Sequence, residues 1–279
     1  MFSIVIPAHN EAAVIGRCLD ALLSEPPQEG MEIIVACNGC TDNTAAIAAS
    51  YEGVRVVDIP EASKIAGLNA GDAAATNFPR AYVDADVRVT GRALEQACRV
   101  LDQSQVKVTA PALRVDLSRS NLGVKAFYSI WMRLPYFSKG EMVGSGIYIL
   151  SEQGRARFDH FPQIISDDGY VRGLFAADER KMDAVSHFTI YAPRTLRELI
   201  KIKTRARFGN MEVEQKYPAI QVGGENGAKD LLAVVARNPL LLVNAVIYCF
   251  IQLQTKRKAL ARMVAADYHT WERDNSSRS

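Results

Sequence analysis

The sequence has no large excess of charge of either sign. Its 279 residues include 33 basic and 31 acidic side chains, which leaves a formal net charge of +2. A balance this close to neutral argues against bulk nucleic-acid binding, which usually needs a strongly basic domain. Hydrophobic residues make up 48% of the chain. The composition is therefore that of a folding sequence, and the length suits one large α/β domain or two small ones.

Cysteine is also scarce, and the chain has no internal repeat or low-complexity linker. The five cysteines are an odd number spread over a long chain, which argues against a disulfide scaffold and indicates a reducing compartment. Met1 runs directly into an apolar segment, without the basic region and the cleavage site of a secretory signal. We therefore expect a cytoplasmic protein.

Apolar, β-branched runs alternate with helical patterns over the first hundred residues. The sequence predicts strands at 2–6, 32–37, 54–59 and 81–84, and helices at 10–24, 41–50, 62–76 and 91–103. Pro7 should end the first strand, and Asn10 is a suitable N-cap for the helix that follows. Strands that alternate with helices predict a parallel sheet with right-handed crossover connections.

Polar sequences follow three of these strands, at residues 7–11, 37–42 and 84–86. Ligands of parallel α/β sheets bind beyond the carboxyl ends of the strands. Because three polar segments converge on that edge, the sequence predicts a binding site there.

Asp84 and Asp86 are the first candidates for chemistry. Two carboxylates spaced two residues apart at a strand end can hold Mg²⁺ or Mn²⁺ and leave positions for phosphate oxygens. The alternative is a loop with two solvated aspartates. Lys64 begins an Ala-rich helix, where it could reach a diphosphate; the alternative is an exposed surface lysine.

Four motifs occur in order along the chain: Val-Ile-Pro-Ala-His-Asn-Glu at 5–11, Asn-Gly-Cys-Thr-Asp-Asn-Thr at 38–44, Lys64-x-x-Gly67-Leu68-Asn69, and Asp84-x-Asp86. Together they resemble the nucleotide-sugar-binding half of a family 2 glycosyltransferase with the GT-A fold. The resemblance covers residues 2–90 well and 140–210 more loosely. It implies an α/β fold that is GT-A-like: a mostly parallel central sheet flanked by helices, with a C-terminal helical extension. It also implies inverting, metal-dependent sugar transfer from a nucleoside-diphosphate sugar, with UDP as the family default.

The resemblance implies a role for each matching residue. Pro7, Ala8, Glu11 and Asn38 would bind the donor nucleotide, Lys64 would lie near its diphosphate, Asp84 would lie near its ribose, and Asp84 and Asp86 would hold Mn²⁺ or Mg²⁺. Cys37 departs from the family pattern, because members carry there an Asp that accepts a hydrogen bond from uracil. A thiol is a weak hydrogen-bond partner, so the sequence leaves the base open. Cys37 and Cys40 lack further ligands for a zinc site, and we expect Cys37 to be a small apolar strand residue.

The second half carries an acidic pair and a basic helix. Asp167 and Asp168 open an expected helix and resemble the family's acidic pair, whose second member is the catalytic base; the resemblance assigns that role to Asp168. The alternative is helix capping. Residues 194–207 are rich in Arg and Lys. Residues 203–208 resemble the Gln-x-x-Arg-Trp region of processive members, which would place Arg207 near donor phosphate. The alternative is a solvated or membrane-facing charge run.

The one long apolar run lies near the C-terminus. Residues 238–255 contain 18 uncharged positions, a length of about 27 Å as a helix, which is marginal for crossing a bilayer. Basic residues flank both ends, so a helix in the plane of the membrane interface satisfies the charge distribution better than a span. Packing in the protein core is the third possibility. Asn238-Pro239 should break a preceding helix at 228–237.

We therefore expect three segments: 1–90 for nucleotide-sugar binding, 91–215 for the acceptor side with the catalytic base, and 216–279 as a helical, membrane-associated segment. The expected activity is metal-assisted glycosyl transfer to a hydroxyl of a saccharide or lipid-linked acceptor, at the cytoplasmic face of the membrane and without nucleic-acid partners. The alternatives are a nucleotidyltransferase and a non-catalytic sugar-nucleotide-binding membrane scaffold.

Overall fold

The structure, a computed structural model, describes residues 1–138, 145–222 and 227–265. The chain divides into two compact units. Unit 1 comprises Met1–Arg114, Met142–Gln163 and Leu174–Ile190, and unit 2 comprises Val115–Glu141, Ile164–Gly173 and Tyr191–Ser279. The division expected at residues 90 and 215 separates the donor-binding segment from the acceptor-binding segment. The two compact units do not test that functional division, so it stays a prediction. Residues 266–279 of the expected C-terminal segment lie outside the described residues.

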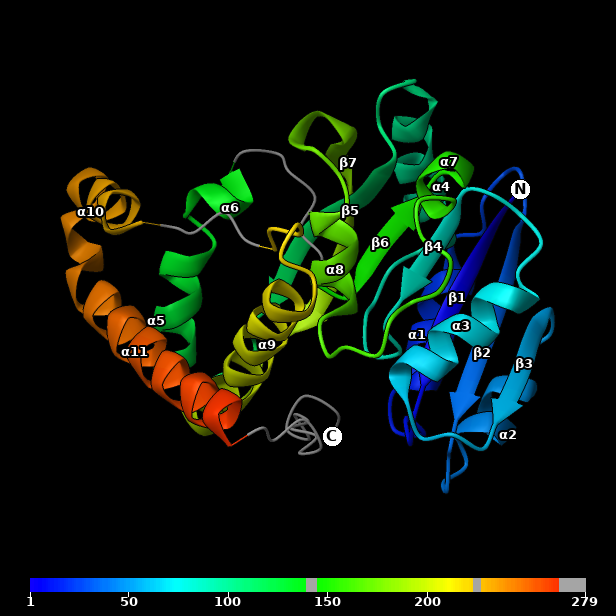
Figure 1. The fold of residues 1–279 in the computed structure, drawn as a ribbon, viewed down its shortest axis with the longest axis horizontal. Helices are drawn as coiled ribbons and strands as arrows, with labels where there is room; N and C mark the ends of the chain where they lie inside the picture. The colour runs from blue at the N-terminus through cyan, green and yellow to red at the C-terminus, as the bar shows by residue number, and fades with distance from the viewer. Residues whose placement is uncertain (139–144, 223–226, 266–279) are drawn as a thin grey trace. The chain divides into compact units, whose positions relative to one another are not determined.

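Strands and helices alternate through the first part of the chain, as expected (Figure 1). In chain order the elements are β1 (Phe2–Ala8), α1 (Ile15–Ser24), β2 (Met31–Asn38), α2 (Thr44–Ala49), β3 (Val54–Ile59), α3 (Lys64–Ala74), β4 (Arg80–Val83), α4 (Gly91–Cys98), β5 (Val108–Asp116), β6 (Ile147–Leu150), α7 (Glu152–Arg155) and β7 (Arg180–Tyr191). In the described part of the chain, seven strands form one sheet in the order β3-β2-β1-β4-β6-β5-β7.

The strands β1 to β4 pair in parallel, as the alternating pattern predicts. Every residue of β1 is buried, which is typical of a parallel strand covered on both faces. Helix α3 packs against β1, β2 and β3 (Figure 1). It lies so close that a Cβ at Gly71 would come 2.5 Å from Cγ1 of Val5. The position therefore requires glycine.

The first strand is longer than expected, because it continues through Pro7 to Ala8. The N–H of Ser3 points toward the β4 side, where it donates to the carbonyl of Pro79. Odd-numbered residues of β1 share that direction, and pairing with β4 ends at Val5. The missing N–H of Pro7 therefore falls beyond the paired region, where proline removes no ladder hydrogen bond.

The sheet becomes antiparallel at β6, which the sequence analysis did not predict. Strand β6 pairs antiparallel with β4, from Arg80↔Leu150 to Val83↔Ile147, and also antiparallel with β5. Residues 108–116 and 180–191 were not identified as strands from the sequence. The fold class expected from the sequence, a mostly parallel sheet flanked by helices, nevertheless describes the strands that carry the candidate donor site.

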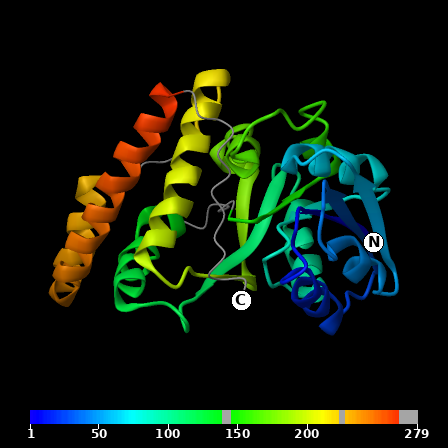
Figure 2. The ribbon, with the colours of Figure 1, turned by 90° about the horizontal axis from the view of Figure 1, so that it is seen from below.

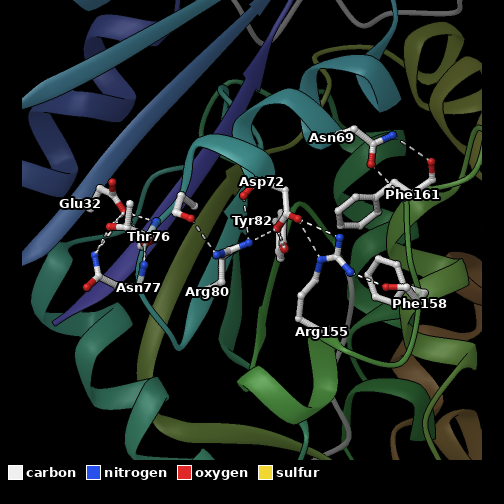
Figure 3. Close-up of polar contacts among 12 residues, drawn as sticks. Glu32, Asn69, Asp72, Thr76, Asn77, Arg80, Tyr82, Arg155, Phe158 and Phe161 are labelled. Atoms are coloured by element: carbon white, nitrogen blue, oxygen red, sulfur yellow. Dashed lines mark hydrogen bonds and ion pairs between the residues drawn. The ribbon is translucent and has the colours of Figure 1, made fainter.

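A buried carboxylate joins α3 to β4 and α7 (Figure 3). Asp72 Oδ1 lies 2.5 Å from Nη1 of Arg80, and Asp72 Oδ2 accepts from Nη2 of Arg155 at 2.8 Å. The hydroxyl of Tyr82 also donates to Asp72. Burial acts to raise the pKa of Asp72, but the hydrogen bonds from Arg155, Tyr82 and Arg80 outweigh it and lower the pKa. Asp72 is therefore a charged group whose burial depends on its two arginine partners.

Asn69, on the same helix, fastens the segment that follows α7. Its Nδ2 donates to the carbonyl of Phe161 at 3.1 Å, and its Oδ1 accepts from the Phe161 N–H at 2.9 Å (Figure 3). Asn69 satisfies both backbone groups of one residue, so α3 is tied to this segment at a second point.

Unit 2 is mainly helical. Its elements are α5 (Leu122–Trp131), α6 (Pro135–Ser138), α8 (Asp167–Gly173), α9 (Leu196–Lys216), α10 (Ala228–Arg237), a 3-10 turn (Pro239–Leu241) and α11 (Leu242–Val264). The expected break at Asn238-Pro239 is confirmed. Figure 2 shows α11, orange to red, running beside α9, yellow; α11 packs against both α9 and α5.

The C-terminal helix has two apolar faces. Its inner face is buried against α5 and α9 through Ala245, Tyr248, Ile251, Thr255 and Ala259. Other apolar side chains of the helix are exposed to solvent, namely Leu242, Val243, Val246, Phe250, Leu253, Leu260 and Val264. Among the described residues, the stretch Pro239–Val264 is long and apolar enough to cross a membrane by length and composition, a property that core helices of soluble proteins share.

A lysine is enclosed by aromatic rings in the core of unit 2. Nζ of Lys203, on α9, lies 3.6 Å from the ring centre of Trp131 and 5.6 Å from that of Tyr128, both on α5. Burial lowers the pKa of Lys203 to about 7. The rings stabilise the ammonium through cation–π contacts, while the loss of water around it favours the neutral amine.

We expect Asp72→Asn to lower the free energy of unfolding by about 3–5 kcal/mol, because it leaves the buried guanidinium of Arg80 and the partly buried guanidinium of Arg155 without their counter-charge. Urea denaturation would measure the change. Asp159→Asn is the matched control: the Asp159 side chain is 91% exposed, and its removal should change stability by less than about 0.5 kcal/mol. Equal effects of the two variants would contradict this assignment.

A second prediction concerns pH. Between pH 7 and pH 10 the unfolded chain holds a proton on Lys203 that the native chain lacks, since the pKa of Lys203 falls to about 7 on folding. The stability of the wild type relative to Lys203→Met should therefore rise with pH in this window, by about 1 kcal/mol per pH unit. Urea denaturation across the window measures it. The exposed Lys125 on α5 provides the control, and Lys125→Met should show no such slope.

Candidate functional site

Two loops at the carboxyl ends of β1 and β2 are bonded to each other. In two of these hydrogen bonds a side chain donates to a backbone carbonyl: Nδ1 of His9 to that of Asn38 (2.6 Å), and the thiol of Cys40 to that of Ala8 (3.2 Å). In the other three a backbone N–H donates to a side-chain oxygen: Thr41 to Oδ1 of Asn10 (2.8 Å), Glu11 to Oγ1 of Thr44 (2.7 Å), and Ala12 to Oδ2 of Asp42 (3.1 Å). Because a carbonyl oxygen only accepts, Nδ1 of His9 carries the proton. These hydrogen bonds hold the loop after Ala8, which contains Glu11, against the loop that follows Asn38 at the end of β2.

Asn10 belongs to this loop connection, and its expected role as a helix N-cap is wrong. Helix α1 begins only at Ile15, and Asn10 adopts a left-handed conformation with φ of 52°. Its side chain accepts the Thr41 N–H from the neighbouring loop. The side chain of Asn can accept a hydrogen bond from a backbone N–H of its own segment or of another loop. The sequence pattern around Asn10 therefore does not show which of the two N–H groups it binds.

Asn38 presents an unsatisfied acceptor at the end of β2. The residue is 2% exposed, and within the described part of the chain its Oδ1 has no hydrogen-bond partner. A Cβ at Gly67 of α3 would come 2.9 Å from that Oδ1. Cys37, next to it, is buried as expected. Burial, with a smaller contribution from Cys40, raises the pKa of the Cys37 thiol to about 12, so the thiol is protonated at neutral pH.

Lys64 stands at the first position of α3, as the sequence predicts. The Ser63 side chain caps the helix by accepting from the Ala66 N–H. Nζ of Lys64 lies 2.8 Å from Oδ1 of Asp84, and both side chains are partly exposed. Two of the predicted site residues, separated in sequence, are therefore in direct contact. The cation and the start of α3 together make a favourable place for an anion.

Asp84 and Asp86 follow directly after β4, and residues 85–86 form a turn. They are partly exposed, whereas Ala85 and Val87 are buried. The Asp84 N–H donates to the carbonyl of Gly146 at 2.8 Å. Gly146 has φ of 96°, and a Cβ there would approach Val87 to 2.8 Å and Oδ2 of Asp84 to 3.3 Å. The glycine therefore keeps the space beside the Asp84 carboxylate open.

The donor set fits a hard divalent cation. The chain offers two partly exposed carboxylates two residues apart after β4, and carboxylate oxygen suits Mg²⁺ or Mn²⁺. Their negative field reaches into the core: burial raises the pKa of the Cys18 thiol to about 12, and the charges of Asp86 and Asp84 add to that effect. Among the described residues, no three or more His, Cys, Asp or Glu side chains gather as a metal cluster. A cation here would therefore need further oxygen ligands from water or substrate.

Asp168 lies at the first turn of α8, in unit 2. Its Oδ1 accepts from the Gly169 N–H at 2.8 Å and lies 3.1 Å from Oγ of Ser166. The same Oγ lies 2.8 Å from Oδ1 of Asn210. The preceding Asp167 is 3% exposed, whereas Asp168 is only partly buried. Of the acidic pair, Asp168 is the carboxylate that water and solutes can reach.

The cations of α9 take part in contacts within unit 2. Nη2 of Arg207 donates to Oε1 of Gln252 on α11 at 3.1 Å, and Nζ of Lys201 pairs with Glu198 at 2.9 Å. Lys203 contacts the aromatic rings described above. The run of basic residues is therefore only in part a solvated surface. A role of Arg207 near donor phosphate stays a prediction.

The sequence did not reveal which side chains connect the two loops. They are His9, Asn10, Thr41, Asp42 and Thr44, which join the ends of β1 and β2. The sequence contained one local signal for a turn in this loop, the pair Asp42-x-Thr44. Oδ1 of Asp42 accepts a hydrogen bond from the Thr44 N–H at 3.0 Å. The bonds between the loops depend on the parallel register, which places Ala8 opposite Cys37.

Solved structures of glycosyltransferases share the fold. A mannosyltransferase from Pyrobaculum calidifontis, in complex with GDP-Man and Mn²⁺, matches 97% of this chain and 76% of its own, with a TM-score of 0.63 and 18% identity. Glucosyl-3-phosphoglycerate synthase from Mycobacterium tuberculosis, in complex with Mn²⁺, UDP and glucosyl-3-phosphoglycerate, matches 81% of each chain with a TM-score of 0.54 and 18% identity. The expected GT-A-like fold is confirmed.

Sequence comparison gives the family. The 4,4'-diaponeurosporenoate glycosyltransferase of Staphylococcus aureus is 28% identical over 180 residues, which are 61% of this chain. The chain spans less than half, 45%, of that relative's length. The family model described as "Glycosyl transferase family 2" matches residues 3–164. That segment is more than half of the chain and contains β1 to β4, Lys64, Asp84 and Asp86. The chain therefore belongs to glycosyl transferase family 2.

Proposed function

We propose that this chain transfers a sugar from a nucleoside-diphosphate sugar to an acceptor hydroxyl, with inversion at the anomeric carbon and with a divalent metal. One observation carries the proposal: Lys64 and Asp84 are in contact at 2.8 Å, at the start of α3 and beside Asp86. A cation, a helix N-terminus and two carboxylates then gather at the carboxyl edge of a parallel sheet. Such an arrangement suits a diphosphate and its metal. The two structural relatives described above are complexes that contain Mn²⁺ together with GDP-Man or UDP.

The donor nucleoside is proposed to bind between the joined loops of β1 and β2. Pro7, Ala8 and Glu11 would line one side of this pocket. Asn38 would read the base, because its buried Oδ1 has no hydrogen-bond partner in the described part of the chain and a buried acceptor gains from a donor. Uracil, thymine and guanine each carry a ring N–H, and cytosine an amino N–H, that could donate to this oxygen. The family default of UDP is therefore one of several candidates, and calorimetry with each nucleotide would separate them.

The metal is proposed to be Mn²⁺ or Mg²⁺, held by Asp84 and Asp86. When bound, such an ion neutralises charge on the departing diphosphate. Lys64 would contribute a second positive charge to the same diphosphate. Its present partner, Asp84, is a proposed metal ligand, so donor and metal binding would redistribute this contact.

Asp168 is proposed to be the catalytic base. Its carboxylate would take the proton of the acceptor hydroxyl while that oxygen attacks the anomeric carbon. The bond from this carbon to the diphosphate oxygen breaks, and the nucleoside diphosphate leaves from the opposite face, which inverts the configuration. The Gly169 N–H holds Oδ1 of Asp168 in position. Arg207 would assist at the donor phosphate.

The acceptor is proposed to be a saccharide or a lipid-linked intermediate, used at the cytoplasmic face of a membrane. Support comes from the exposed apolar side chains of α11 and from the name of the curated relative, a glycosyltransferase of 4,4'-diaponeurosporenoate.

We expect Asp86→Asn to weaken metal-dependent binding of the cognate nucleoside diphosphate roughly 100-fold, because one of the two proposed ligands loses its charge. Calorimetry of UDP, GDP, dTDP and CDP, with and without Mn²⁺, measures it. The exposed Asp102 is the control, and Asp102→Asn should bind like the wild type. The donor site is wrongly placed if no nucleotide binds to the wild type under any metal condition.

We expect Asp168→Asn to lower kcat by about 10²–10⁴-fold, the range that a general base contributes, with the KM for the donor little changed. Steady-state assays of sugar transfer give both constants. Glu214→Gln, an exposed acid on α9, should leave them unaltered. Normal nucleotide binding without any turnover in the wild type would favour a non-catalytic sugar-nucleotide-binding scaffold. Release of pyrophosphate from a nucleoside triphosphate would indicate a nucleotidyltransferase.

A further inference from the structure

An apolar stripe runs along the solvent side of the C-terminal helix. Four side chains of α11 define this outer face, with exposed fractions of 69% for Val243, 64% for Val246, 54% for Phe250 and 55% for Leu253; Leu240, which is 91% exposed, precedes them in the 3-10 turn. They follow one another at spacings of three and four residues, so they lie on one side of the helix. A helix on a water-exposed surface normally carries polar residues there.

The opposite face binds α11 firmly to unit 2. Tyr248 stacks on Phe127 of α5 with ring centres 5.2 Å apart, and Ile251 is fully buried. Polar contacts act at the same face: Asn244 donates to Oγ of Ser129 at 2.8 Å, and Gln252 accepts from Arg207 at 3.1 Å. The helix therefore cannot cross a bilayer alone without breaking these contacts, and Arg207 would be costly in hydrocarbon.

The charged residues of α11 itself all have one sign. The sequence contains no acidic residue between Asp230 and Asp267. Lys256, Arg257 and Lys258 are exposed and follow the apolar stripe directly. Arg237, also exposed, precedes it. An apolar face flanked only by exposed basic groups complements a surface that is apolar inside and anionic at its boundary.

A second copy of this chain fits the face less well. In a parallel pair of α11 helices, the three exposed cations of each copy would meet those of the other. In an antiparallel pair they would lie beside the apolar residues of the partner helix, with no acid within the stretch to pair with. A bilayer that contains anionic phospholipid satisfies both the apolar stripe and the cations.

We propose that the outer face of α11 docks in the plane of a membrane rich in anionic phospholipid, with Lys256, Arg257 and Lys258 at the headgroups. This inference specifies how the chain would attach to the membrane, and it rests on the proposed function for the role of that attachment. The docking itself requires no turnover, so it is tested independently of sugar transfer.

Co-sedimentation of the full chain with vesicles tests the proposal. Vesicles of phosphatidylcholine with phosphatidylglycerol should bind the chain, and vesicles of phosphatidylcholine alone should bind it much more weakly, since each surface Lys or Arg contributes about fivefold. Lys256→Gln with Lys258→Gln should reduce the anionic preference by about 25-fold. High salt should reduce it as well.

Val246→Ser with Phe250→Ser should abolish binding to the anionic vesicles, because it removes the apolar contact. Both side chains are more than half exposed, so the fold should survive, which circular dichroism checks. Leu122→Ser is the matched control, an 83% exposed leucine on α5 of the same unit, and should bind like the wild type.

Three outcomes would overturn the proposal. The first is equal binding to neutral and anionic vesicles, or no binding to either. The second is a dimer in sedimentation equilibrium without lipid that Val246→Ser with Phe250→Ser dissociates, which would assign the face to a second copy. The third is resistance of the vesicle-bound chain to alkaline extraction, which would indicate a span. Calorimetry of nucleotide binding on the same preparation separates a failure of docking from a failure of the proposed donor site.

Discussion

The close packing of α3 on the sheet is the constraint on which the candidate donor site depends. Glycines at positions 67 and 71 let the helix approach Asn38 and Val5 to distances that a Cβ would not allow. Asp72 fixes the far end of the helix to Arg80 and Arg155. At its first residue the same helix presents Lys64 to Asp84. The position of Lys64, which is proposed to contact the diphosphate, thus depends on the close packing of α3 and on the ion pairs of Asp72 near the other end of the helix.

Unit 2 stabilises its charges differently. In unit 1 a buried carboxylate has two guanidinium partners, whereas in unit 2 the ammonium of Lys203 lies against aromatic rings and burial lowers its pKa to about 7. Arg207 instead hydrogen-bonds to a neutral side chain of α11. Helix α9 therefore contacts α5 and α11 through some of its basic residues. The opposite, outer side of α11 takes no part in these contacts.

The positions of many candidate donor-site residues in the fold could be predicted, because each lies next to a strand or helix that the local sequence pattern identifies. Pro7, Asn38, Lys64 and Asp84 stand at strand ends or at a helix start, and the carboxyl ends of parallel strands share one edge. The contacts that join the loops were not predictable in the same way. Asn10 could cap a helix or bond to Thr41 in another loop, and only the register of β1 with β2 decides between them.

The sequence by itself determined the alternating β/α order of the first hundred residues, the acidic and basic side chains at the strand ends, and the helix break at Pro239. These features depend on periodicity, proline chemistry and residue type within a few positions. Only the tertiary structure decided that β1 continues through Pro7, that β6 joins the sheet antiparallel, and that α11 buries one apolar face while exposing the other. Each of these depends on which neighbour supplies a hydrogen-bond partner or excludes water, and that information lies in residues far apart in the chain.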